Sequence, residues 1–75
     1  MRKSFYHFLM RYRDEAGNDH YSEFANSAFN DHSFPKQALD FYEISAYLEL
    51  NGSYLPSMTV FDQVWEEYEV WENKR

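Results

Sequence analysis

Two copies of the triplet Asn-Asp-His, at residues 18–20 and 30–32, carry side chains that could form a metal site or an acid/base pair. A shared zinc ion would need His20 and His32 within about 2.0–2.3 Å of it. If the intervening residues are helical, a rise of about 1.5 Å per residue separates the triplets by roughly 17 Å. We therefore predict no metal site. We interpret each triplet as a helix start, in which Asp19 or Asp31 accepts hydrogen bonds from free backbone N–H groups.

The second triplet lies in a connection between two predicted helices. We expect His32 to form a local hydrogen bond there. Replacing His32 or Asp31 should then alter stability before any binding, and replacing His20 should matter less.

Other candidate chemistry is sparse. The chain has no Cys, and it contains neither a nucleophile-elbow sequence nor a glycine-rich phosphate loop. The carboxylates of Glu66, Glu67 and Glu69 are predicted to form the solvated face of a helix. A helical domain of this size has little room for a pocket of several hundred Å³. We therefore expect no catalytic residue, no cofactor and no enzymatic activity.

The N-terminal segment has the most distinctive surface. At 100° per residue, one side carries positive charge beside aromatic and thioether groups, and its candidate interaction residues are Lys3, Tyr6, Met10, Arg11 and Arg13. This side could bind an acidic protein segment or a nucleic acid, whose bases stack on rings and whose phosphates meet arginine. Alternatively, Tyr6 and Met10 pack on another helix and the arginines meet the acidic C-terminal helix. The sequence leaves both interpretations open.

Apolar residues recur at i, i+3, i+4 and i+7, and this period predicts helices at approximately residues 4–15, 19–30, 34–51 and 58–72. Ser4 is a suitable N-cap for the first helix, and Gly17 can close it in a left-handed conformation. Pro35 suits the first turn of the third helix. Gly52 should end that helix.

The third and fourth predicted helices differ in pattern. Because the third is apolar on most sides, it is predicted to be central. The fourth is amphipathic, because one of its faces is apolar and carries Phe61, Val64, Trp65, Tyr68 and Trp71, with Asp62, Glu66 and Glu69 opposite. Ser57 could cap it, or Thr59 could do so in a capping-box variant with Asp62. A further expectation is incomplete burial of Val70, Trp71, Tyr47 and Tyr54.

Length, composition and charge limit the classes of protein to which the chain can belong. Seventy-five residues suit a single domain over residues 1–75, and seven Phe, seven Tyr and two Trp predict an aromatic core. The formal charge of −6 argues against a general phosphate-backbone binder. Positive charge is concentrated in Arg2, Lys3, Arg11 and Arg13, and all acidic residues follow them. No apolar run is long enough to span a membrane, so we expect a cytoplasmic protein without membrane partners.

Three segments resemble a known family: SFYHFLMRYR (4–13), EFANSAFNDHSFPK (23–36) and FYEISAYLELNGSYLPSMTVFDQVWEEY (41–68). They are similar to the YozE family of small, uncharacterised bacterial proteins. The resemblance implies an all-α, compact four-helix domain with a SAM-like arrangement, found mainly in Firmicutes and cytoplasmic. It implies no reaction, cofactor or catalytic residue.

These observations favour a non-enzymatic interaction module that binds another protein through an aromatic-containing surface. The alternative is binding of a nucleic acid such as DNA through the basic face of the first helix, which the net charge disfavours. The biological role, the partner's identity and the oligomeric state do not follow from the sequence.

Overall fold

A computed structural model describes residues 3–55 and 57–74 of the chain, and Arg2 lies outside this range. Its helices are α1 (Phe5–Leu9), the 3-10 helix η1 (Met10–Tyr12), α2 (His20–Asn30), α3 (Phe41–Asn51) and α4 (Met58–Asn73). The described ranges contain no strand. The predicted all-α class is therefore confirmed.

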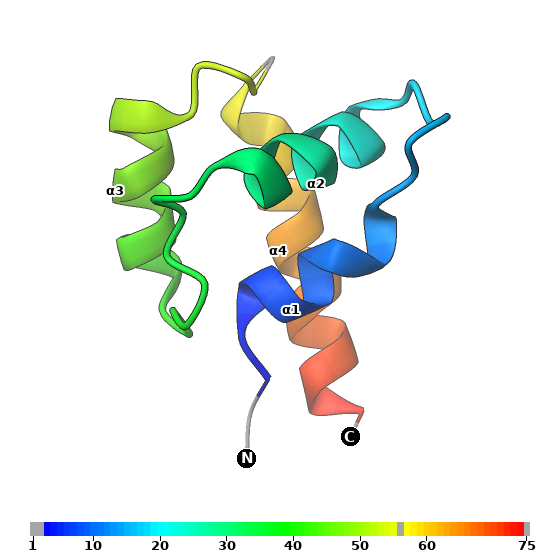
Figure 1. Cartoon of the computed structure of the whole chain (residues 1–75). Helices are drawn as coiled ribbons and strands as arrows, with labels where there is room; N and C mark the ends of the chain where they lie inside the picture. The colour runs from blue at the N-terminus through cyan, green and yellow to red at the C-terminus, as the bar shows by residue number, and fades with distance from the viewer. Residues whose placement is uncertain (1–2, 56, 75) are drawn as a thin grey trace.

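The helices are arranged around α4. This helix contacts α1, α2 and α3, while α2 also contacts η1 (Figure 1). The start of α1 and the end of α4 lie at the same end of the molecule, where the Lys3 N–H donates a 3.1 Å hydrogen bond to Glu72 Oε2. None of the described helices is both long and apolar enough to cross a bilayer.

Aromatic rings form the centre of the core, as composition predicts. Phe5, Phe24, Phe61 and Tyr68 have no exposed surface. The Phe5 ring meets Phe61 and Tyr68 edge to face, at centroid distances of 5.4 and 5.7 Å. The buried Tyr68 hydroxyl donates a 2.5 Å hydrogen bond to the carbonyl of Lys3. This bond satisfies the one polar group that the ring brings into the core.

The first helix is shorter than predicted. Ser4 caps it as expected, accepting a 3.1 Å hydrogen bond from the His7 N–H. However, η1 ends at Tyr12 and Arg13 is extended, because the exposed residues that follow offer no apolar contact to a further helical turn. Gly17 does not adopt the predicted left-handed conformation. Its need for glycine is steric, since an added Cβ would lie 2.6 Å from Ser22 Oγ.

The third helix begins at Phe41, not near residue 34. The preceding segment forms turns, with Pro35 accepting a hydrogen bond from the Ala38 N–H. Phe34 and Ala38 insert into the core, and the Ala38 carbonyl accepts a 3.4 Å hydrogen bond from the Phe5 N–H. The segment therefore packs on α1, which a continuous helix would prevent. The prediction of Pro35 in a first helical turn is wrong.

The prediction that the third helix is central is also wrong. Only Ile44 and Leu48 are buried on α3, whereas Tyr42 is 77% and Leu50 85% exposed. Gly52 ends the helix as predicted, and its N–H donates to the Leu48 carbonyl at 2.8 Å. The central element is α4, because it contacts each of the other α-helices.

The second and fourth helices agree with prediction to within a residue at each end. Asp19 caps α2 through a 2.9 Å hydrogen bond from the Ser22 N–H. Ser57 occupies the N-cap position of α4, but its side chain makes no capping hydrogen bond. Thr59 lies inside α4, so the capping-box variant with Asp62 is wrong.

The two Asn-Asp-His triplets therefore differ in role. The first starts α2, whereas the second ends it, because Asp31 is the C-cap residue and accepts a hydrogen bond from the Ser33 N–H. The helix-start prediction for the second triplet is wrong. Across residues 3–55 and 57–74, no group of three or more His, Cys, Asp or Glu side chains could hold a metal ion.

Candidate functional site

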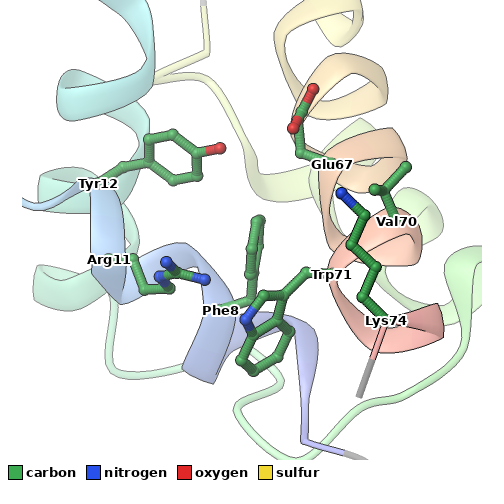
Figure 2. A pocket seen from close by; sticks show the side chains of 7 residues that line it. All are labelled: Phe8, Arg11, Tyr12, Glu67, Val70, Trp71 and Lys74. Atoms are coloured by element: carbon green, nitrogen blue, oxygen red, sulfur yellow. The ribbon is translucent and has the colours of Figure 1, made fainter.

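A groove lies between α1 with η1 on one side and the C-terminal half of α4 on the other (Figure 2). Its cavity has a volume of about 340 Å³, so the prediction that the domain has little room for a pocket of several hundred Å³ is wrong. The cavity is lined by Phe8, Arg11, Tyr12, Glu67, Val70, Trp71 and Lys74. We call this the α1–α4 groove. It joins residues from the two ends of the chain.

Helical spacing explains why each wall presents these side chains. Phe8, Arg11 and Tyr12 stand at i, i+3 and i+4 along α1 and η1, and residues 67, 70 and 71 repeat the same spacing on α4. Lys74 follows at i+7 as the C-cap residue of α4. Such positions share one helix face. The walls meet where the rings of Phe8 and Trp71 approach with centroids 5.2 Å apart.

The apolar part of the groove is partly open to solvent. Phe8 is only 4% exposed, Trp71 is half-buried and Val70 is 46% exposed. The predicted incomplete burial of Val70 and Trp71 is therefore confirmed. These side chains offer a ligand an aromatic and alkyl surface without disturbance of the core.

Cations border this apolar surface. The Arg11 guanidinium carbon lies 5.5 Å from the ring centroids of both Phe8 and Trp71, a distance suited to cation–π attraction. The ammonium group of Lys74 extends from α4 into the same space, close to Val70 and Glu67 (Figure 2). A ligand carboxylate would therefore find Arg11 beside an apolar surface, whereas Lys74 lies next to the Glu67 carboxylate (Figure 2).

Tyr12 and Glu67 mark the other part of the groove. Burial, and then the nearby Glu67 carboxylate, raise the pKa of the Tyr12 phenol. The hydroxyl therefore stays protonated at neutral pH and can donate a hydrogen bond. The described lining residues include no His, Ser, Thr or Cys, so the groups available here favour binding by apolar contact, hydrogen bonding and charge.

The predicted interaction residues of the N-terminal segment do not form one surface. Tyr6 packs near Phe34, with ring centroids 5.6 Å apart, and Met10 packs against the core. Lys3 is exposed near the end of α4. Of this set, only Arg11 lines the α1–α4 groove.

Arg13 turns towards a different helix. Its guanidinium carbon lies 3.6 Å from the ring centroid of Phe29 on α2. Arg13 therefore does not meet the acidic fourth helix, whereas Arg11 shares the groove with Glu67 of that helix. A role of the five residues in partner binding stays a prediction.

Sequence reasoning missed Phe8, Tyr12, Glu67 and Lys74 as groove residues. Phe8 and Tyr12 share the apolar i, i+3, i+4, i+7 pattern of the first predicted helix with Phe5 and Leu9, and Glu67 belongs to the predicted solvated face. The available signal was the α4 spacing of residues 67, 70, 71 and 74, which runs beside the buried stripe. Which residues of the first helix lie opposite these positions depends on how α1 packs on α4, and the spacing alone does not give this.

A polar cluster surrounds Asp31, apart from the α1–α4 groove. Its Oδ2 accepts hydrogen bonds from the hydroxyls of Tyr47 at 2.5 Å and Tyr54 at 3.1 Å. Both tyrosines are half-buried, as predicted. His32 is exposed, and its side chain has no hydrogen bond within the described residues. The local bond expected for His32 is therefore absent there, and Asp31 makes the structural contacts.

These hydrogen bonds fix the protonation of the cluster. The bond from Tyr47, followed by those from the Ser33 N–H and Tyr54, lowers the pKa of the Asp31 carboxyl. The bond to Asp31 raises the pKa of Tyr47 to about 12. Burial, then the bond to Asp31, raises the pKa of Tyr54. At neutral pH the cluster is one carboxylate with two phenol donors.

The helix order and packing define a small all-helical domain of the SAM-like class. The family model described as YozE SAM-like fold matches residues 4–70, and the chain belongs to this family. A UPF0346 protein of Bacillus pumilus (strain SAFR-032) is 56% identical over 97% of this chain and 99% of its own length. The UPF0346 protein YozE of Bacillus subtilis (strain 168) is 57% identical over 89% of this chain and 90% of its own.

A solved structure supports the same fold. The solution NMR structure of the UPF0346 protein YozE from Bacillus subtilis superimposes with a TM-score of 0.84 at 53% identity. The match covers 97% of this chain and 89% of that one. The predicted family and SAM-like four-helix fold are therefore confirmed.

Proposed function

We propose that this chain is a non-enzymatic interaction module that binds a segment of another cytoplasmic protein in the α1–α4 groove. The observation that carries the proposal is the position of Arg11 beside the rings of Phe8 and Trp71, next to the exposed Val70. The cytoplasmic setting in a Firmicute is supported by the family resemblance and by the absence of Cys from the sequence.

The expected ligand segment has a large apolar side chain next to Asp or Glu. The apolar side chain would contact Val70 and Trp71, where burial on binding contributes about 25 cal/mol per Å² of apolar surface. The neighbouring carboxylate would meet Arg11, because the Lys74 ammonium lies on the other wall of the groove beside Glu67 (Figure 2). Charge complementarity of this kind sets the orientation of a segment and excludes wrong partners more than it adds affinity.

Glu67 limits where the bound segment can carry a negative charge. Its carboxylate lies in the groove near Tyr12 and away from the Arg11 guanidinium (Figure 2). A second acidic residue on the ligand would be repelled there, whereas a hydrogen-bond acceptor could bind the Tyr12 hydroxyl. We therefore expect a single acidic residue at one end of the bound segment, not a polyanion.

The same features argue against the alternative of nucleic-acid binding. The net charge is −6. Arg11 and Arg13 point to different helices, and the Lys36 ammonium lies over the Tyr6 ring at a distance of 5.7 Å. A phosphate backbone needs several cations along one track, and this arrangement supports a discrete site more than a continuous one.

The proposal is tested by selecting peptides from a random display library on the immobilised protein. We expect enrichment of sequences that place a large apolar residue next to Asp or Glu, and loss of this enrichment on a Val70→Asp variant. Because Val70 is 46% exposed, this change should leave the fold intact. Enrichment that is the same on both proteins would contradict the groove as the binding site.

A further inference from the structure

We infer that the outer face of α3 is a second docking surface, which binds a Lys- or Arg-flanked amphipathic helix of another protein. We define the α3 outer face by Tyr42, Ala46 and Leu50. Tyr42 and Leu50 are 77% and 85% exposed, and Ala46 is exposed between them. This surface goes beyond the α1–α4 groove and shares no residue with it.

The three residues form a continuous apolar stripe along the helix. Their spacing of i, i+4 and i+8 places them within an arc of about 80° at 100° per residue. Ile44 and Leu48, which anchor α3 in the core, lie on the opposite side. The helix therefore has one apolar face towards the core and another towards solvent, and a second apolar face of this kind is typical of an interaction surface.

The charges around the stripe indicate the chemistry of its partner. Glu43 and Glu49 are exposed on its two flanks. Residues 37–73, which include all of α3 and α4, contain eight Asp or Glu and no Lys, Arg or His. A partner that covers Tyr42 and Leu50 must approach through this negative field. Flanking cations on the partner would be attracted, and flanking acids repelled.

The same charges oppose pairing of this face with a second copy of itself. In a two-fold contact, each residue pairs with its counterpart on the same surface patch. An antiparallel α3 pair would therefore bring like charges together, with the Glu43 carboxylates of both copies on one flank of the stripe and the Glu49 carboxylates of both copies on the other. These carboxylates would repel each other as the stripe became desolvated. A cationic helix from a different protein avoids this cost.

The inference is tested with a designed peptide of Leu and Lys that forms an amphipathic helix, with leucines at i, i+3, i+4 and i+7. A control peptide has each Lys replaced by Glu. Titration of the isotope-labelled protein should shift the backbone amide resonances of Tyr42, Ala46 and Leu50 with the Lys peptide only. Shifts centred on the exposed Asp62 and Glu66 of α4, or equal shifts with both peptides, would overturn the inference.

Matched variants separate apolar docking from general attraction between charges. Tyr42→Ser combined with Leu50→Ser should weaken binding of the Lys peptide at least about tenfold, since two large side chains lose their burial. Asp62→Asn combined with Glu66→Gln removes two exposed acids from α4 and should weaken it less than about threefold. Equal losses in the two double variants would contradict docking on α3.

Sedimentation of the wild type tests the second-copy alternative. We expect a monomer at concentrations where the Lys peptide binds. A dimer that Leu50→Ser converts to monomer would show that a second copy covers the α3 outer face, and would overturn the inference. Thermal melting of both double variants verifies that they are folded, as expected for changes at exposed positions.

Discussion

The Tyr47 hydroxyl of α3 donates a 2.5 Å hydrogen bond to the carboxylate of Asp31 at the end of α2. Tyr54, in the connection between α3 and α4, donates to the same oxygen. Since α3 buries only Ile44 and Leu48, this shared carboxylate is a principal polar link between α3 and the rest of the domain. It helps to set the direction in which the α3 outer face points.

Replacing Asp31 should therefore destabilise the fold. Asp31→Ala leaves two phenol donors without their acceptor, and we expect a loss of about 1–2 kcal/mol, at the lower end for charged hydrogen bonds because the cluster is partly solvated. Urea denaturation measures this loss. His32→Ala and His20→Ala are matched controls at exposed positions and should change stability by less than about 0.5 kcal/mol. A His32 effect as large as that of Asp31 would contradict this account.

The Asp31 cluster should also make stability depend on pH. Its folded carboxyl pKa is depressed, so the unfolded chain binds the proton more readily. The stabilisation is fully present above the unfolded Asp pKa of about 3.9 and is lost as pH falls through the lower folded value. Denaturation between about pH 2 and 7 should show the advantage of wild type over Asp31→Ala shrinking below about pH 4. A constant difference over that range would rule out this linkage.

The Tyr47 phenol should make stability depend on pH in the opposite direction, with a loss in alkali. Its folded pKa is raised to about 12, above the unfolded value of about 10. Its contribution is therefore complete below about pH 10 and is lost as pH rises through about 12. The free energy of unfolding of wild type minus that of Tyr47→Phe should be smaller at about pH 11 than at about pH 8. An unchanged or larger difference would contradict the bond to Asp31.

Two leucines of α3 test the peripheral position of this helix. Leu48 is 3% exposed and Leu50 is 85% exposed. Leu48→Ala should therefore cost about 2–5 kcal/mol, whereas Leu50→Ala should stay within about 0.5 kcal/mol of wild type. Thermal or urea denaturation of the pair gives both values. Similar costs at the two positions would instead support a central third helix.

Features encoded by neighbouring residues were predictable from sequence. Ser4 and Asp19 cap helices through residues only three positions away. The stripe of α4 follows from its period alone, because Phe61, Val64 and Tyr68 repeat at helical spacing. The family resemblance independently implied the same fold.

Features that depend on distant contacts were not predictable in this way. Phe34 and Ala38 look compatible with a helix, yet their burial against α1 holds that segment in turns. Asp31 meets Tyr54 only after α2 and the α3–α4 connection have come together. The α1–α4 groove likewise requires Arg11 to meet the last turns of α4, more than fifty residues further along the chain.

The central claim is that the α1–α4 groove binds an acidic, apolar protein segment, and the affinity of one selected peptide tests it most directly. Its Kd should be measured for wild type, Arg11→Glu and Arg13→Glu, which carry the same charge change inside and outside the groove. We expect Arg11→Glu to weaken binding at least about tenfold, a change of about 1.4 kcal/mol, and Arg13→Glu to have little effect. Equal weakening by both variants, or a loss of about a thousandfold or more between about 50 and 200 mM salt, would contradict the claim.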